Sequence, residues 1–336
     1  MSTSNASLLN VEFSYPPTNL ISCSDNGITL YSIEGNKFEK KTKILFSGGI
    51  GNVSMTANSN IIYLVGGGET PMKSPDTFSI YDAKTTQIIS ATTDEDKILN
   101  IKNCGNLIVI VALKRIHVFK INQNGQPIKF LTKLTYSNPH GLCVINNNLN
   151  LTDKTKEILI STPGSSIGTA SVWNPNTESY LPFNAHDGEL ECIAINNEGT
   201  FIATASEKGT LIRIFKVDMG KKEYEFRRGT SSATIYNMCF NKDSTILACC
   251  SSHGTVHLFS LSEKIKNKRS VFSGLKYVSG YFDSKWCFRV LDISTKKSTC
   301  TFDNDDVLHI ACVDGKYYRI EGPEYNEVKE FLFDIL

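Results

Sequence analysis

The chain has 336 residues, 40% of them hydrophobic and 21% charged, so it can bury a substantial core and is neither disordered nor a coiled coil. Its 35 Lys and Arg against 34 Asp and Glu leave a net charge of +1, which excludes the broad basic surface typical of nucleic-acid-binding domains. No apolar run reaches the roughly 18 residues of a membrane-spanning helix, and no signal peptide begins the chain. We therefore expect a cytoplasmic protein that does not bind nucleic acid.

Short segments rich in β-branched and aromatic residues alternate along the chain with turns rich in Asn, Asp, Gly and Ser, a pattern typical of all-β proteins. Two stretches, 189–217 and 233–261, share the order strand, Asn-rich turn, strand, Gly-Thr turn, strand. Their glycines Gly209 and Gly254 are about 45 residues apart, as in four-stranded propeller blades. The chain has room for seven such units, so we predict an all-β, seven-bladed, WD-repeat-like β-propeller.

Weaker copies of this rhythm extend the repeat over the rest of the chain. Tyr81-Asp82 and Trp173-Asn174 stand where WD repeats carry their Trp-Asp pair. Because one blade cannot bury both of its faces, the units should close into a single domain over 1–336. The approximate blades that we expect are 7–47, 48–92, 93–133, 134–182, 183–228, 229–284 and 285–336.

Motifs for catalysis or metal binding are scarce. The six His and ten Cys residues show neither His-Glu-x-x-His nor Cys-x-x-Cys spacing, and we interpret the cysteines as small buried residues. The glycine run 66–68 resembles a phosphate-binding loop, but Met72 stands where that motif requires Gly. We therefore expect no enzyme, no metal and no cofactor. A propeller hydrolase would need a convergent cluster of acid, base or metal ligands at the axis.

An arginine pair, Arg227-Arg228, stands between the two clearest repeats, at the end of an expected outer strand. Adjacent residues of an extended strand point in opposite directions, so Arg227 should face the preceding blade and Arg228 the following one. Guanidinium binds phosphate through paired hydrogen bonds, and hydroxyl groups can complete the phosphate oxygens. The pattern therefore predicts two small anion sites. The alternative is an ordinary pair in which one arginine contacts an acid and the other is solvated.

The repeats place further polar side chains at equivalent positions beside each arginine. Those grouped with Arg227 are His186, Ser206, Thr210 and Arg213, and those grouped with Arg228 are Ser251, Thr255 and His257.

The segment Phe226-Arg227-Arg228-Gly229, between the Gly-Thr turns at 209–210 and 254–255, resembles the signature of the PROPPIN family of β-propellers, which includes the WIPI proteins. The segments 64–68, 138–141 and 281–288 also resemble sequences of this family. The resemblance implies a protein of autophagy and endolysosomal traffic that binds phosphatidylinositol 3-phosphate and the 3,5-bisphosphate on membranes. It also implies that the two groups of residues above line two lipid sites. The protein would lie peripherally on phagophore or preautophagosomal, endosomal or vacuolar membranes.

Residues 262–280 interrupt the sixth unit with basic side chains followed by apolar ones. The resemblance implies a loop that inserts into the bilayer, and the short form here resembles the compact branch of the family. Basic residues beside apolar ones suit a lipid headgroup interface, whereas the alternative is a solvated loop. The residues concerned are Lys264, Lys266, Lys268, Arg269, Phe272, Leu275, Lys276 and Tyr277.

The turn Pro71, Met72, Lys73 should be a rigid, exposed hairpin tip. The resemblance implies that this region contacts a lipid-transfer protein of the autophagy machinery. Two alternatives for the whole chain remain, a WD-repeat scaffold that binds proteins without recognising lipid and a propeller hydrolase.

Overall fold

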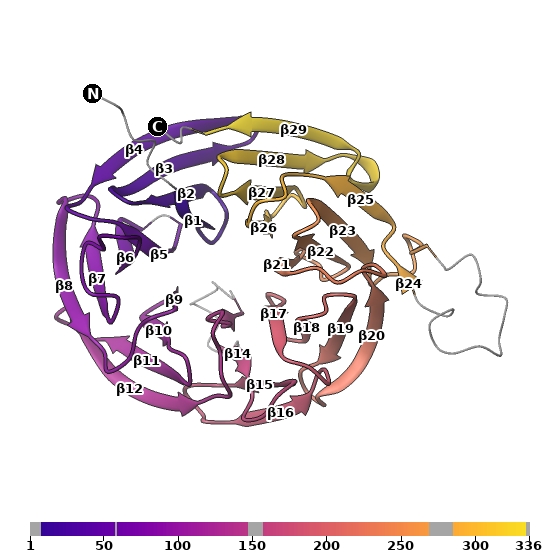
Figure 1. Cartoon of the computed structure of the whole chain (residues 1–336), viewed down its shortest axis with the longest axis horizontal. Coiled ribbons are helices and arrows are strands. Elements are labelled where there is room, and N and C mark those ends of the chain that lie inside the picture. The colour runs from indigo at the N-terminus through magenta and orange to yellow at the C-terminus, as the bar shows by residue number, and fades with distance from the viewer. Residues whose placement is uncertain (1–7, 58, 147–156, 269–284, 334–336) are drawn as a thin grey trace.

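The computed structural model describes residues 8–57, 59–146, 157–268 and 285–333. Its strands form seven sheets around a central axis, which confirms the predicted all-β, seven-bladed β-propeller (Figure 1). The first strand of each sheet lies nearest the axis and the last lies towards the rim (Figure 1). Across the described ranges the single helical element is the 3₁₀ turn η1 (Pro323–Tyr325), so no helix there could span a membrane.

The first four sheets each contain four consecutive antiparallel strands. The first sheet comprises β1 (Leu8–Phe13), β2 (Asn19–Ser24), β3 (Gly27–Glu34) and β4 (Lys37–Leu45), and the second β5 (Ile50–Met55), β6 (Ile61–Gly66), β7 (Thr77–Asp82) and β8 (Gln87–Thr93). The third comprises β9 (Asn100–Cys104), β10 (Leu107–Val111), β11 (Arg115–Ile121) and β12 (Pro127–Leu134), and the fourth β13 (Val144–Ile145), β14 (Ile160–Pro163), β15 (Thr169–Trp173) and β16 (Tyr180–Asn184).

The last three sheets contain the two clearest repeats and the end of the chain. The fifth comprises β17 (Leu190–Ile195), β18 (Phe201–Ser206), β19 (Leu211–Lys216), β20 (Lys221–Arg227) and β24 (Lys285–Trp286). The sixth comprises β21 (Ile235–Phe240), β22 (Ile246–Ser251), β23 (Thr255–Ser260) and β25 (Arg289–Asp292), and the seventh β26 (Ser298–Phe302), β27 (Leu308–Cys312), β28 (Lys316–Glu321) and β29 (Glu327–Leu332).

The predicted boundary between the sixth and seventh units, at 284/285, is wrong. β24 pairs with β20 of the fifth sheet, and β25 completes the sixth sheet by pairing with β23. The seventh sheet begins only at β26. The interruption after β23 lies inside the sixth unit, so the outermost strand of that unit follows it in the chain.

Burial within each sheet explains the strand sequences. The central strand β10 reads LIVIV, and all five of its residues are buried because sheets pack on both of its faces. The outer strand β4 reads KFEKKTKIL and is mostly exposed. Lysines along such an edge discourage pairing with another chain.

The Asn-rich turns of the two clearest repeats have the same structure. Asn196 Oδ1 accepts hydrogen bonds from the backbone N–H groups of Thr200 and Phe201, at 2.8 and 2.9 Å. Asn241 Oδ1 accepts two at 2.8 Å in the next sheet. Each buried amide thus satisfies the backbone of a tight turn between the first two strands.

The ring closes by side-chain packing between the first and seventh sheets, each of which is built from its own consecutive strands. Phe38, at the edge of the first sheet, stacks on Tyr317 of the seventh with ring centroids 4.3 Å apart. Tyr31 and Phe333 meet in the same cluster at 5.3 Å. The aromatic contacts therefore hold together the two ends of the described chain.

Candidate anion sites beside Arg227 and Arg228

Strand β20 carries the arginine pair into the seam between the fifth and sixth sheets. Phe226 is fully buried and stacks on Phe259 of β23, with ring centroids 5.0 Å apart. This aromatic contact fixes the end of β20 against the sixth sheet. Arg227, the last residue of β20, and Arg228, which follows it, therefore lie where two sheets meet.

Arg228 is only 3% exposed, and three neutral acceptors hold its guanidinium group. Its Nε donates to Gly209 O at 2.9 Å, its NH2 group donates to Ser231 O, and its NH1 group donates to His253 Nδ1 at 3.3 Å. Burial lowers the pKa of the Arg228 guanidinium. Arg228 does not face the following blade alone, as alternation had predicted, but bridges the fifth and sixth sheets.

Arg227 ends β20 and is half-buried. Its backbone pairs with Leu211 on one side and, through the parallel bridge to β24, with Trp286 on the other. The two arginines therefore differ in environment although they are adjacent in sequence.

The structure brings together His186 and Arg213 of the group predicted beside Arg227. His186 Nε2 lies 3.0 Å from Thr204 Oγ1. Arg213 donates to Ala185 O at 2.8 Å and to Glu225 Oε2 at 2.9 Å. Burial and then the positive charge of Arg213 lower the pKa of His186 to about 4, so this imidazole is neutral at pH 7.

Ser206 and Thr210 border the turn that also holds Arg228. Ser206 ends β18 and is largely buried, and its carbonyl accepts the N–H of Gly209 at 2.8 Å. Thr210 is half-buried, and its carbonyl accepts the backbone N–H of Arg228 at 2.9 Å. The backbone of this turn thus connects the two groups of residues.

The polar residues predicted beside Arg228 form a continuous chain of contacts. Ser251 Oγ lies 3.1 Å from Thr255 Oγ1, which lies 3.1 Å from His257 Nε2. His257 Nδ1 in turn lies 3.3 Å from Cys287 Sγ. Burial and the nearby charge of Arg228 lower the pKa of His257 to about 4, so this ring is also neutral at pH 7.

Sequence reasoning missed four residues of these clusters. His253 occupies the turn position that Lys208 holds in the preceding repeat, so the repeat alignment could have indicated it. Thr204 and Glu225 lie opposite Arg213 on the neighbouring strands, at registers that become known only with the sheet. Nothing in the sequence indicated Cys287, because its contact with His257 depends on how the chain crosses from the fifth sheet to the sixth after the interruption.

The predicted membrane loop is described only at its base. Lys264, Lys266 and Lys268 are exposed, and Lys268 O accepts the backbone N–H of Trp286 at 2.9 Å. This bond places the base of the loop beside the strand pair that contains Arg227. Outside the described residues lie Arg269, Phe272, Leu275, Lys276 and Tyr277.

The predicted partner turn is less exposed than expected. Pro71 and Met72 are half-buried, and Met72 donates its backbone N–H to Gly49 O at 3.0 Å. The Met72 side chain packs on the apolar cluster between the first and second sheets. Lys73 alone of the three is exposed, because the backbone of Gly48 and Gly49 packs against Pro71 and Met72.

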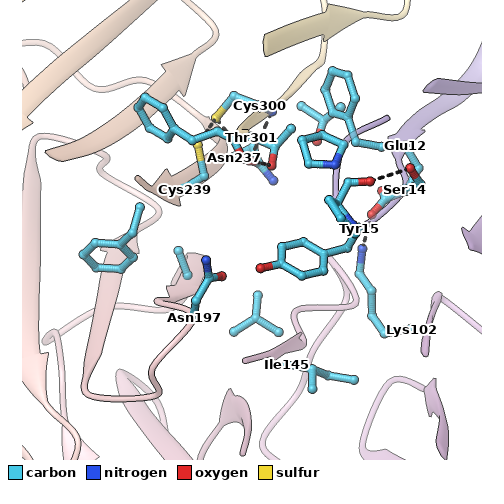
Figure 2. A pocket seen from close by; sticks show the side chains of 18 of the residues that line it. Glu12, Ser14, Tyr15, Lys102, Ile145, Asn197, Asn237, Cys239, Cys300 and Thr301 are labelled. Carbon is cyan, nitrogen blue, oxygen red and sulfur yellow. Dashed lines mark hydrogen bonds and ion pairs between the residues drawn. The ribbon is translucent and has the colours of Figure 1, made fainter. Parts of the chain in front are cut away.

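A polar cavity lies on the axis, lined by residues of the first strands of all seven sheets. Figure 2 shows part of its lining. Glu12 and Lys102 form an ion pair there, and Cys239 Sγ lies 3.4 Å from Cys300 Sγ (Figure 2). Within the described residues no group of three or more His, Cys, Asp or Glu side chains is placed to hold a metal ion.

Comparison with solved structures supports the architecture. The chain superposes on Hsv2 of Kluyveromyces marxianus with a TM-score of 0.74 at 17% identity, covering 98% of each chain. It superposes on KlAtg21, solved in complex with the coiled coil of AgAtg16, with a TM-score of 0.77 at 23% identity, covering 98% of this chain and 100% of that one.

Sequence comparison finds longer relatives. SVP1-like protein 2 of Neurospora crassa is 30% identical over 258 residues, which span 76% of this chain but only 57% of that protein. SVP1-like protein 2 of Pichia angusta is 26% identical over 96% of this chain and 94% of its own length. Autophagy-related protein 18 of Saccharomyces cerevisiae is 28% identical, covering 80% and 65% respectively.

The family assignment rests on a match that spans most of the chain. The sequence model of the PROPPIN family matches residues 9–304. This range includes the second to sixth sheets complete, the first sheet except for Leu8, the arginine pair and both groups of polar residues. The chain belongs to the PROPPIN family.

Proposed function

We propose that this protein is a non-enzymatic phosphoinositide effector that binds phosphatidylinositol 3-phosphate and phosphatidylinositol 3,5-bisphosphate on membranes. The two sites lie beside Arg227 and Arg228. The observation that carries the proposal is the buried guanidinium of Arg228, whose three acceptors are two backbone carbonyls and an imidazole nitrogen. None of these carries a negative charge, and no acidic side chain among the described residues forms an ion pair with Arg228. Burying a cation without a counter-ion is costly. A phosphate group would supply that charge.

The second site would use the chain of hydroxyl groups next to Arg228. Ser251 and Thr255 provide oxygens that can donate to a phosphate, and His257 is neutral and adds no negative charge. Charge-assisted bonds from guanidinium to phosphate are about twice as strong as neutral ones. These groups therefore suit a monoester phosphate on an inositol ring.

The first site would use Arg227 with His186, Ser206, Thr210 and Arg213. Here Arg213 already contacts Glu225, so a headgroup would share that cation with a carboxylate. We therefore propose that the first site is the weaker of the two. Two sites on one molecule would act together on a membrane, since the second binding event becomes intramolecular.

We further propose that the protein acts in autophagy or membrane traffic from the cytoplasmic side, peripherally on phagophore, endosomal or vacuolar membranes. One curated relative is an autophagy-related protein, and a structural neighbour was solved with a coiled-coil partner. Both support a role in recruiting protein partners, including a lipid-transfer protein at the turn 71–73. The exposed lysines at 264, 266 and 268 would add attraction to an anionic bilayer, about 1 kcal/mol each.

Liposome flotation tests the lipid assignment. The wild-type protein should float with vesicles that contain phosphatidylinositol 3-phosphate and remain at the bottom with vesicles of neutral lipid. Equal recovery on both would reject lipid recognition and leave the protein-binding scaffold. Vesicles that carry phosphatidylinositol 4-phosphate, with the same surface charge as those that carry the 3-phosphate, separate headgroup recognition from simple electrostatic attraction.

Substitution of the arginines tests the two sites. Arg227→Thr and Arg228→Thr should each remove most of the flotation, while Arg115→Thr, which breaks an exposed ion pair with Asp96 in the third sheet, should not. Because Arg228 also supports the fold, Arg228→Lys and thermal unfolding of each variant distinguish lost binding from lost structure. Wild-type flotation by either single threonine variant would disprove the two-site arrangement.

A further inference from the structure

The segment 285–292 crosses from the fifth sheet to the sixth. β24 pairs in parallel with β20, with Arg227 opposite Trp286. β25 pairs with β23, with His257 opposite Val290. Cys287 lies between these two pairings, is 5% exposed and packs in the apolar cluster shared by the two sheets. The crossing therefore holds the Cys287 thiol directly behind the second candidate site.

The hydrogen bond between the Cys287 thiol and the His257 ring can run in either direction. Sγ lies 3.3 Å from Nδ1, so either the thiol donates to the nitrogen or the nitrogen donates to the sulfur. Burial raises the pKa of the Cys287 thiol, so the thiol keeps its proton at pH 7. A neutral imidazole nitrogen is a good acceptor and sulfur a poor one, which favours donation from S–H to Nδ1.

That direction fixes the rest of the chain of contacts. A neutral imidazole carries one ring proton, so with Nδ1 accepting, the proton is on Nε2. Nε2–H then donates to Thr255 Oγ1, 3.1 Å away. The Thr255 hydroxyl proton remains available for Ser251 Oγ, at 3.1 Å, or for a ligand.

The opposite arrangement would give a site unsuited to an anion. If Nδ1 carried the proton, Nε2 would be an acceptor, and the Thr255 hydroxyl would have to donate to it. Ser251 would then have to supply the only hydroxyl proton of this chain that faces a ligand. A phosphate presents acceptors only, so it needs every donor of the site directed towards it.

We infer that Cys287 is a positioning residue, whose thiol fixes the Nε2–H tautomer of His257 and thereby makes the Thr255 and Ser251 hydroxyls donors to a phosphate-bearing headgroup at the second site. This inference rests on the proposed lipid-binding function. Cys287 itself need not touch the lipid, because it acts through the buried ring.

Nitrogen-15 NMR of the lipid-free protein tests the tautomer without any ligand. Wild-type His257 should show Nε2 protonated and Nδ1 unprotonated at pH 7, and Cys287→Ser, which keeps a donor, should show the same. Cys287→Ala should shift the ring towards the other tautomer. A wild-type ring protonated on Nδ1 would overturn the inference whatever the protein binds.

Calorimetry with soluble short-chain phosphatidylinositol 3-phosphate tests the consequence at each site. In an Arg227→Thr background, where the second site remains, Cys287→Ala should weaken binding about tenfold, the effect of one lost hydrogen bond of about 1.4 kcal/mol. Cys287→Ser should restore most of it. In an Arg228→Thr background, where the first site remains, Cys287→Ala should change little.

Two outcomes of the calorimetry would reject the positioning role. Equal weakening in both backgrounds would show a general packing effect, and no weakening in either would show that the thiol is irrelevant to binding. Cys312→Ala in the seventh sheet, also fully buried, is the matched control for loss of a buried thiol. If the wild-type protein itself failed to bind this lipid, the proposed function would fall, and the NMR result would still report separately on the tautomer.

Discussion

Arg227 and Arg228 show how far two adjacent residues of one type can differ. Arg228 is nearly inaccessible and holds the carbonyls of Gly209 and Ser231 together, whereas Arg227 is half-buried at the end of a strand. Arg228 is therefore both a residue that supports the fold and a candidate phosphate-binding residue. Any loss of binding in an Arg228 variant has to be separated from a loss of stability.

Buried His257 and half-buried His186 predict a pH dependence of stability. The pKa values of His186 and His257 are lowered to about 4 in the folded protein, against about 6.5 in the unfolded chain. Protons therefore bind the unfolded chain more readily, so the free energy of unfolding should fall as the pH drops from about 6.5 to about 4. Each histidine should contribute about 2 kcal/mol of this loss by pH 5.

Urea unfolding between pH 7.5 and pH 5 measures this effect. The groups that face His186 are Arg213, Glu225 and Asp187. The variant His186→Gln should unfold with a smaller pH dependence than wild type over this range. Identical slopes in the two proteins would contradict the assignment of a half-buried, neutral His186.

Glu225 offers a way to strengthen the first candidate site. Glu225→Gln removes the carboxylate that contacts Arg213 at 2.9 Å and leaves the cation available to a headgroup. Short-chain lipid binding in the Arg228→Thr background should tighten about threefold, because partly exposed ion pairs contribute less than about 1 kcal/mol. Glu223→Gln, on the same strand as Glu225, breaks the ion pair with Lys216 of β19 and should have no such effect; weaker binding by Glu225→Gln would count against a phosphate at this site.

At the scale of elements, the turns could be predicted because their chemistry is local. Gly209 has a φ of +57°, and a Cβ there would lie 1.9 Å from Ala233 O, so glycine is required. Asn196 and Asn241 occupy matching places for the same hydrogen-bonding reason. Because these requirements are local, the same Gly and Asn residues recur at matching positions, and the two repeats can be recognised from the sequence.

The crossing at 285–292 could not be predicted for the opposite reason. β24 has two residues and β25 four, too few to show a period of two. Their partners β20 and β23 lie on the far side of the interruption, and nothing in the sequence indicates the pairing. The same gap explains why the grouping of Arg228 with Ser251, Thr255 and His257 was possible while the contact with Cys287 was not.

Asn241 provides a test of the turn chemistry. Asn241→Ala removes the acceptor of two backbone N–H groups in a turn where the side chain is 2% exposed. The free energy of unfolding should fall by about 2 kcal/mol, the cost of leaving buried donors unpaired. The control Asn124→Ala, in an exposed turn of the third sheet, should change it by less than about 0.5 kcal/mol; equal losses would contradict the role given to the amide.

At the scale of the whole molecule, the ring depends on the aromatic cluster that joins the first and seventh sheets. Phe38→Ala removes a ring that contacts Tyr31, Tyr317 and Phe333. The free energy of unfolding should fall by about 2 to 3 kcal/mol, because Phe38 is only half-buried. Hydrogen exchange should quicken in the first and seventh sheets more than in the third to fifth.

Phe130→Ala is the matched control, because that phenylalanine is 44% exposed on the third sheet. It should leave exchange unchanged at the junction of the ring. Uniform acceleration over all seven sheets in Phe38→Ala would show that the molecule opens only as one unit, with no weaker point at this junction.

The first four sheets and the seventh are each built from four consecutive strands, which makes the order of the sheets around the ring separable from the order of the sequence. A cut in the linker between β8 and β9 leaves the strands of every sheet on one continuous piece of chain once the two ends are joined. A circularly permuted chain could have a short tether from residue 333 to residue 8 and new ends in that linker. It would form the same sheets, and each sheet would keep the same two neighbours. The junction held by Phe38 and Tyr317 would then be covalent, and the new ends would lie where apolar side chains pack the second sheet against the third.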